Sequence, residues 1–131
     1  LRKVKERIRE LTSRRISISI KERVERLNQY LRGWLGYYYI ADMKSHLKKL
    51  GSWIRRRLRM CLWKQWKKVK TKIRKLRGLG ISDKEAIKIG NSRKGYWHLS
   101  KSQQLHRALN NQFWAELGLV NLIAAYSQHR Q

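Results

Sequence analysis

The chain has 131 residues, a formal net charge of +25 and a hydrophobic content of 41%, including six Trp and six Tyr. This aromatic content excludes a disordered basic tail, because such tails lack the side chains that build a core. A single Cys excludes an intramolecular disulfide and favours a reducing compartment, and no apolar run is long enough to span a membrane. We therefore expect a folded cytoplasmic protein made of one medium domain or two small ones.

The chain contains no proline, which removes the commonest helix breaker and favours an all-α fold. Apolar residues recur every three or four positions over 4–11 and predict a short first helix. Residues 16–20 alternate between Ile and Ser with the period of a strand, but the segment is short and has no obvious partner strand. We therefore expect an extended linker there.

A long second helix is predicted over residues 20–38. Ser19 and Glu22 have the spacing of a capping box, in which the serine side chain accepts a hydrogen bond from the start of the helix. Gly33 and Gly36 interrupt the helix, and each costs about 1 kcal/mol relative to Ala. We expect close contact with a neighbouring helix to offset this cost.

A third and longer helix is predicted after Asp42, which is a suitable N-cap. Its predicted buried face consists of Met43, Leu47, Leu50, Ile54, Leu58, Cys61 and Leu62. Apolar periodicity continues to residue 76, either along one rod or with a bend at residues 66–70. Gly78 and Gly80 end this run.

The rest of the chain predicts shorter elements. Ser82 and Glu85 form a second capping-box pattern, which opens a helix that ends near residue 89. Residues 90–95 have the composition of a loop. Residues 96–99 are expected to be extended.

A third capping-box pattern, Ser100 with Gln103, predicts another helix. Apolar residues beyond it predict the final helices, with a break at Gly118. Because charge density falls and the elements shorten after the glycines near residue 80, we expect one domain over 1–78 and a second over 81–131.

The acidic residues do not predict a catalytic or metal site. There are eight of them, and those on the first two helices lie at helical spacing from Lys or Arg, as solvated ion pairs do. Residues 39–42 (YIAD) faintly resemble the metal-binding turn of a polymerase, but the second aspartate of that turn is missing. A helix cap is therefore the simpler interpretation of Asp42. Cys61 fits an inert core position, and His98 and His106 leave either an RNA contact or a surface role open. We expect no catalytic residue, metal or cofactor.

The segment from residue 43 to residue 81 carries fifteen Lys and Arg and no acidic residue. Like charges at this density repel one another, and nucleic acid is the commonest polyanion that neutralises them. Arginine can hold a phosphate with two nitrogens and stack on bases, whereas lysine acts as a point charge. Trp63 and Trp66 lie among these cations, where they either contact sugars and unpaired bases or pack against the second helix.

A second basic and aromatic cluster surrounds Gly95. It combines Arg93 and Lys94 with Tyr96 and Trp97, and the two aromatic rings either stack on nucleotides or fill a small core. The predicted nucleic-acid-binding residues are Arg55, Arg56, Arg57, Arg59, Trp63, Lys64, Trp66, Lys67, Lys68, Lys70, Arg93, Lys94, Tyr96 and Trp97.

These segments resemble a known family. Residues 27–38 (LNQYLRGWLGYY), 53–59 (WIRRRLR) and 63–68 (WKQWKK) resemble the maturase-specific segment, also called the thumb or domain X, of bacterial group II intron reverse transcriptases. Residues 91–97 (NSRKGYW) and 105–110 (LHRALN) resemble the DNA-binding region that follows it. The resemblance covers nearly the whole chain.

The resemblance implies a three-helix, thumb-like bundle followed by a small helical module, neither of them catalytic. It implies group II intron RNA, an RNA–DNA template–primer duplex and target DNA as partners, together with the fingers and palm of the same parent reverse transcriptase. Magnesium would belong to that palm and no cofactor to this segment. The implied roles are intron splicing and mobility in a bacterial cytoplasm, in association with the nucleoid or a ribonucleoprotein. The endonuclease that some members append has no support here.

Two other interpretations remain open from the sequence. The same module could serve a reverse transcriptase that acts in defence or diversification. A basic amphipathic protein could instead bind an anionic membrane surface, although the charged segment also carries a regular core stripe, which favours nucleic acid over membrane.

Overall fold

The computed structural model describes residues 2–37 and 43–129, and its regular structure over those residues is entirely helical. The all-α prediction is therefore confirmed. The helices are α1 (Arg2–Leu11), α2 (Ile20–Tyr37), α3 (Lys44–Gln65), α4 (Val69–Gly78), α5 (Asp83–Gly90), α6 (Tyr96–Leu99), α7 (Gln103–Ala108), α8 (Asn111–Glu116) and α9 (Leu122–His129).

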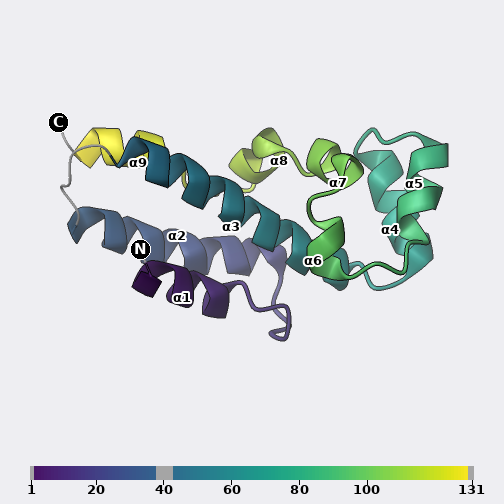
Figure 1. Ribbon diagram of the computed structural model, residues 1–131, viewed down its shortest axis with the longest axis horizontal. Coiled ribbons are helices and arrows are strands. Elements are labelled where there is room, and N and C mark those ends of the chain that lie inside the picture. The colour runs from purple at the N-terminus through teal and green to yellow at the C-terminus, as the bar shows by residue number, and fades with distance from the viewer. Residues whose placement is uncertain (1, 38–42, 130–131) are drawn as a thin grey trace.

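The molecule is elongated, with α2 and α3 running along its length (Figure 1). α1 lies beside α2, and α9 packs against both α2 and α3. The seven residues predicted for the buried face of the third helix are all buried. Helical spacing of apolar side chains therefore determined which side of α3 faces the core.

The loop between α1 and α2 is organised by a buried arginine. The guanidinium of Arg23, only 3% exposed, donates to the carbonyl oxygens of Leu11 and Ser13 at 3.0 Å and of Ile16 at 2.6 Å. Ser19 accepts from the backbone of Glu22 at 3.1 Å, as its capping-box spacing predicted. The linker prediction is confirmed, since the chain forms no strand there.

The basic run does not form one rod, because the chain turns between α3 and α4. Trp66 is the C-cap of α3, and Lys67 adopts a φ of +43°, the left-handed conformation that ends many helices. α4 then starts in a new direction at Val69. Of the two possibilities left open by the sequence, the bend at residues 66–70 is correct.

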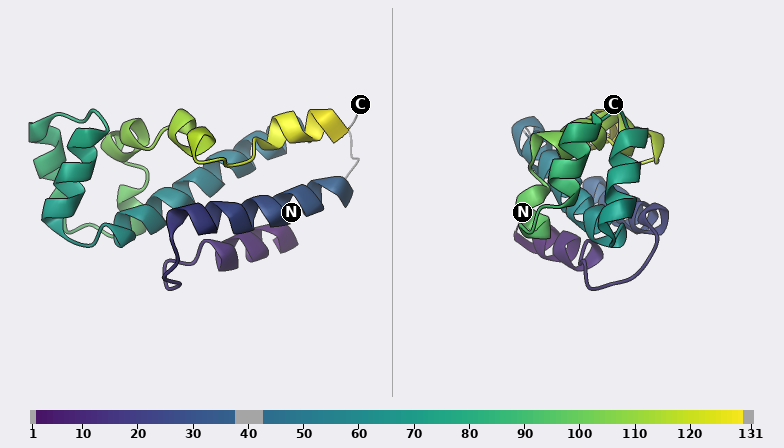
Figure 2. Two further views of the ribbon diagram at one scale, coloured as in Figure 1. Left: turned by 180° about the vertical axis from the view of Figure 1, so that it is seen from behind. Right: turned by 90° about the vertical axis from the view of Figure 1, so that its right-hand side faces the viewer.

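α4 and α5 pack as a pair at one end of the molecule, where a glycine allows a close approach (Figures 1 and 2). A Cβ added at Gly90 would lie 2.7 Å from Cγ1 of Ile73. The close contact expected at Gly33 and Gly36 is wrong, because a Cβ at either position would meet no described atom within 4 Å. The glycine that helix packing requires is therefore in α5, not in α2.

Two local predictions after the loop are also wrong. Residues 96–99 form the short helix α6 rather than an extended segment, and the cap of the next helix is Ser102, not Ser100. Ser100 is instead the buried C-cap residue of α6, where its hydroxyl bonds to the carbonyl of Trp97. Tertiary contacts with α3 decide this choice, because they bury Ser100 and leave Ser102 at the helix start.

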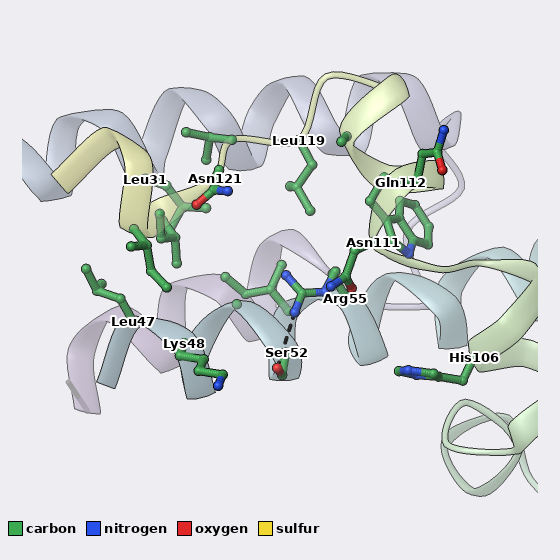
Figure 3. Close-up of a pocket in the computed structure, with 17 residues that line it drawn as sticks. Leu31, Leu47, Lys48, Ser52, Arg55, His106, Asn111, Gln112, Leu119 and Asn121 are labelled. Atoms are coloured by element: carbon green, nitrogen blue, oxygen red, sulfur yellow. Dashed lines mark hydrogen bonds between the residues drawn. The ribbon is translucent and has the colours of Figure 1, made fainter. Parts of the chain in front are cut away.

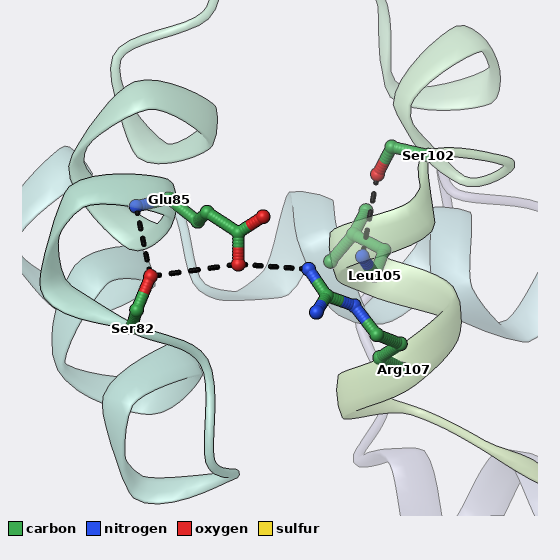
Figure 4. Close-up of polar contacts among 5 residues, drawn as sticks. All are labelled: Ser82, Glu85, Ser102, Leu105 and Arg107. Atoms are coloured by element: carbon green, nitrogen blue, oxygen red, sulfur yellow. Dashed lines mark hydrogen bonds and ion pairs between the residues drawn. The ribbon is translucent and has the colours of Figure 1, made fainter.

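Figure 4 shows the two serine caps and the ion pair that links their helices. Ser82 accepts from the backbone of Glu85 at 3.4 Å, which confirms that capping prediction, and Ser102 accepts from Leu105 at 3.3 Å. The carboxylate of Glu85 lies 2.8 Å from the guanidinium of Arg107. This partly exposed pair connects α5 to α7 but contributes little free energy at a solvated surface.

The C-terminal helices return along the α2–α3 pair. Asn28 of α2 donates to the carbonyl of Gly118 at 2.7 Å and accepts from the backbone of Val120 at 2.8 Å. Gly118 has a φ of +94° and breaks the chain between α8 and α9, as predicted. One hydrophobic cluster extends from Val4 to Tyr126 and crosses residues 78–80. The division into domains 1–78 and 81–131 stays a prediction.

Asp42, the predicted cap of α3, lies outside the described residues. None of the helices described is long and apolar enough to cross a bilayer.

Candidate nucleic-acid interface

Three consecutive arginines of α3 reach three different neighbours. Successive residues of a helix are about 100° apart around its axis, so Arg55 and Arg57 lie on nearly opposite sides of α3, with Arg56 between them. Arg57 extends to the α1–α2 loop, where its Nε donates to Thr12 Oγ1 at 2.6 Å. Arg56 extends to α6, and Arg55 lines a groove beneath α8. The predicted arginine cluster is thus distributed around α3.

Trp53 is the centre of the first cationic cluster. The Lys5 ammonium lies 5.8 Å from its ring centroid, and the guanidinium carbons of Arg9 and Arg57 lie at 5.4 and 5.5 Å. Lys5 and Arg9 are four residues apart and therefore share one side of α1. The packing of α1 on the α2–α3 pair brings them to Trp53 on α3.

Trp97 is the centre of the second cluster. The guanidinium carbon of Arg56 lies 3.6 Å from its ring centroid, which is direct stacking contact. The same guanidinium donates to the Trp97 carbonyl and to Ser100 Oγ, each at 3.0 Å. Arg57 approaches the Trp97 ring from the first cluster at 6.0 Å, so the two clusters adjoin.

Tyr96 extends this surface toward α4. The guanidinium carbon of Arg14 and the ammonium of Lys72 lie 5.5 and 5.7 Å from its ring centroid. Lys72 also lies 4.8 Å from the centroid of Trp63, and its partial burial lowers its pKa. Lys64 contributes nearby by donating to the carbonyl of Arg14 at 2.8 Å.

We call this surface the cation–aromatic face. It consists of Trp53, Tyr96 and Trp97 with Lys5, Arg9, Arg14, Arg56, Arg57 and Lys72. All three aromatic side chains are partly exposed, so the surface is accessible.

No carboxylate within residues 2–37 and 43–129 forms an ion pair with this face. The ion pairs of the described chain are Arg2–Glu6, Arg7–Glu10, Arg26–Glu22, Arg77–Asp83 and Arg107–Glu85. The cations of the face are therefore not compensated by any carboxylate of the described residues. A surface of this kind attracts an external polyanion.

Burial and mutual repulsion act on the arginines of the face. Desolvation lowers the pKa of Arg56. Desolvation is also the main cause of the lowered pKa of Arg57. The neighbouring positive charges of Arg9 and Arg14 lower this pKa further. An anion bound among Arg57, Arg9 and Arg14 would oppose this repulsion, because a negative charge favours the charged form of each guanidinium.

Three predicted binding residues are instead buried. The sequence placed Arg59, Trp63 and Trp66 on an exposed flank of the helix, but they are 4%, 1% and 9% exposed. Arg59 donates to the carbonyls of Ser100 at 3.0 Å and Leu109 at 3.2 Å, and desolvation lowers its pKa to about 10. The alternative in which the tryptophans pack rather than bind is therefore the one the structure favours. Arg59 reaches the core because the α6–α8 segment covers a side of α3 that the local pattern left open. Trp63 instead packs edge to face with Trp66 and lies under Lys72 of α4.

Five predicted residues form a separate exposed group. Lys67, Lys68 and Lys70 lie where α3 meets α4, and Arg93 and Lys94 lie in the loop before α6. Both views of the backbone place these two connections side by side (Figures 1 and 2). We call these five residues the basic corner.

Sequence reasoning missed Lys5, Arg9, Arg14 and Lys72 as members of the face. Lys5 and Arg9 had one usable signal in the sequence, since they sit four residues apart and therefore share one side of the predicted first helix. Cys61, by contrast, is buried as predicted, and desolvation raises the pKa of its thiol.

The first 80 residues match a family model described as Group II intron, maturase-specific domain. The chain belongs to this family. Among curated proteins, none matches the chain. The match covers α1 to α4 and therefore Lys5, Arg9, Arg14, Trp53, Arg56, Arg57 and Lys72 of the cation–aromatic face.

Membership confirms the resemblance inferred from the sequence and makes this a group II intron maturase segment, with a role in splicing. Tyr96 and Trp97 lie in α6, beyond the matched residues, so the cation–aromatic face combines residues of the maturase-specific domain with two residues that follow it.

Proposed function

We propose that this maturase segment binds group II intron RNA through the cation–aromatic face and so helps the intron to fold for splicing. The observation that carries the proposal is the face itself: three accessible aromatic rings, six cations and no ion pair to a described carboxylate. Structural salt bridges would mix the signs of charge, whereas a phosphate-binding surface has cations alone.

The chemistry of each group suggests its role. Lys5, Arg9 and Arg14 are exposed and would neutralise phosphates of the RNA backbone. Arg57 is held by Thr12 and would present its remaining N–H groups to a phosphate in a defined geometry. Trp53 offers part of its ring for contact with a sugar or an unpaired base.

The basic corner supports a second part of the proposal. Lys67, Lys68, Lys70, Arg93 and Lys94 are all exposed and would contact the backbone of a template–primer duplex or of target DNA. Such contacts position a duplex without reading its sequence. In the parent protein the fingers and palm would hold the other side of that duplex, and this segment would take no part in the chemical step.

The test is equilibrium binding of the chain to a group II intron RNA and to an unrelated RNA of equal length, across a range of salt concentrations. The double variant Lys5→Gln/Arg9→Gln removes two cations of the face that lie four residues apart on α1. We expect about tenfold weaker binding at physiological salt. The slope of log K against log salt should fall by about 1.4, because each lost contact to single-stranded phosphate removes about 0.7.

A matched control is available on α5. Lys84 and Lys88 are also exposed, four residues apart and outside every ion pair described, so Lys84→Gln/Lys88→Gln removes the same charge from a helix that contributes no residue to the face. We expect this control to bind within about twofold of the unchanged chain, because neither lysine belongs to the cation–aromatic face or to the basic corner. Equal losses in the two variants would show that net charge alone drives binding and would overturn the proposed interface.

A further inference from the structure

A groove separates α3 from the segment that contains α8 and the start of α9 (Figure 3). It encloses about 780 Å³, within the range of ligand-binding sites. Its aliphatic lining has the buried Leu31 and Leu47 on one side and the partly exposed Leu119 on the other. Val120 and Ile123 also line the groove and are partly exposed. It lies on the opposite side of α3 from Arg57, so it is separate from the cation–aromatic face.

One cation, Arg55, reaches into this groove and has no acidic partner among the described residues. Arg55 is partly buried there, and desolvation lowers its pKa. In the described part of the chain, its hydrogen-bond acceptor is the hydroxyl of Ser52, at 3.2 Å. Gly51 leaves room for it, since a Cβ at that position would lie 3.3 Å from Arg55 Nη1. The guanidinium therefore keeps donors available above an aliphatic floor.

The rim carries further positive or polar groups and no carboxylate from the described residues. Lys48 and His106 lie on either side of Arg55, and Asn111 and Gln112 line the α8 side. Every described lining residue is apolar, neutral polar or basic. The groove is thus complementary to a ligand that has both aliphatic surface and negative charge.

The shape and lining favour a helix over a nucleotide. Residues 47–55 of α3 form one wall, which is about 12 Å long along the helix axis. A second helix lying alongside would span this length with about two turns. A nucleotide would need a ring to stack on, but Trp114 in the floor is fully buried. Aliphatic side chains at helical spacing would instead fit the partly exposed aliphatic side chains of Leu119, Val120 and Ile123, in the manner of helix-in-groove recognition.

We propose that this groove is a docking site for an acidic amphipathic helix of a partner protein, with a carboxylate of that helix on Arg55. The site would let the maturase segment hold a protein while its other face holds RNA. This assignment is independent of the RNA interface, because the two surfaces lie on different sides of α3.

The test uses a fluorescein-labelled helical peptide of about 15 residues, with Leu at positions i, i+4 and i+7 and Glu on the flanks. Its binding to the whole chain is measured by fluorescence anisotropy. A second peptide replaces each Glu by Gln, and a third has the first composition in scrambled order. We expect saturable binding of the first peptide, about tenfold weaker binding of the Gln peptide, and none of the scrambled one.

Two variants with a matched control locate the site. Ala115 is exposed and lines the groove, so Ala115→Trp should obstruct it and weaken the peptide at least about tenfold. Ala124 is exposed on α9 outside the groove, and Ala124→Trp should bind within about twofold of the unchanged chain. Arg55→Gln should abolish the preference for Glu over Gln peptides, whereas Arg74→Gln, an exposed charge change on α4, should keep it.

The outcomes separate the alternatives. If no peptide saturates, or if Ala115→Trp and Ala124→Trp act alike, the docking site is overturned. If Ala115→Trp instead weakens a labelled oligouridylate while the peptide is ignored, the groove holds nucleic acid and the proposal fails. If Ala115→Trp loses the peptide but still binds the oligouridylate, the docking proposal is supported. Circular dichroism checks that each variant is folded.

Discussion

Arg56 stacks on Trp97, with 3.6 Å between its guanidinium carbon and the ring centroid, although 40 residues separate them in the chain. The same arginine donates to the Trp97 carbonyl and to Ser100 Oγ. One side chain of α3 therefore holds α6 through its backbone, its ring and its C-cap at once. The two segments that the sequence identified as separate basic clusters meet at this contact.

Arg56→Lys should destabilise the fold by about 1–2 kcal/mol. Lysine keeps the charge, but it cannot stack a planar group on Trp97 while donating to two acceptors. The free energy of unfolding in urea measures the effect. Arg74→Lys is the control, because Arg74 is exposed on α4, and an equal effect of both changes would contradict the special role of Arg56.

Arg59 should prove structural, not RNA-binding. Arg59→Ala leaves the Ser100 carbonyl unsatisfied and opens a cavity, so we expect a loss of about 3 kcal/mol in the free energy of unfolding. Arg59→Met should lose less, about 1–2 kcal/mol, because Met fills much of the volume and leaves no charge to desolvate. RNA affinity of the folded Met variant should stay within about twofold of the unchanged chain, and a tenfold loss would return Arg59 to the interface.

Cys61 should make the stability of the fold depend on pH above about 9. Its pKa is raised in the folded chain from the usual 9.0, mainly by desolvation, and its thiol lies 3.0 Å from the Thr12 carbonyl. A raised folded pKa contributes stability that is complete below the unfolded pKa and is lost as the pH rises from about 9 through the folded value.

Urea unfolding at about pH 8 and pH 10 tests this, with Cys61→Ala as the reference. We expect the unchanged chain to lose more stability over this interval than the variant does. Iodoacetamide should also modify Cys61 slowly in the folded chain and rapidly in urea. Parallel pH curves for the two proteins would contradict the burial of the thiol.

Gly90 and Ile73 should be energetically coupled. Gly90→Ala places a methyl group 2.7 Å from Ile73 Cγ1, and we expect a loss of about 1–3 kcal/mol. Ile73→Ala removes the obstructing atom, so the double variant should lose less than the sum of the two single changes. Gly33→Ala is the control: its position is open, and the change should be neutral or stabilising by about 1 kcal/mol.

The family, the helical class, the buried side of α3 and the caps at Ser19 and Ser82 could all be predicted from the sequence, whereas the bend near Lys67 was one of two possibilities that it left open. Each depends on residues within a few positions of one another. Apolar spacing defines a helix face, a serine three residues before a glutamate defines a cap, and a run of cations defines the sign of a surface whatever the fold.

The tertiary structure alone decided which cations are accessible. Arg56, Arg57 and Arg59 have the same local context in the sequence, yet Arg59 is buried under α6–α8 and the other two reach the cation–aromatic face. Lys5 and Arg9 join that face from more than forty residues away, and Ser100 lost its predicted cap role to a contact with Arg56. The physical reason is that burial depends on which distant helix covers a side chain, and local periodicity carries no information about that cover.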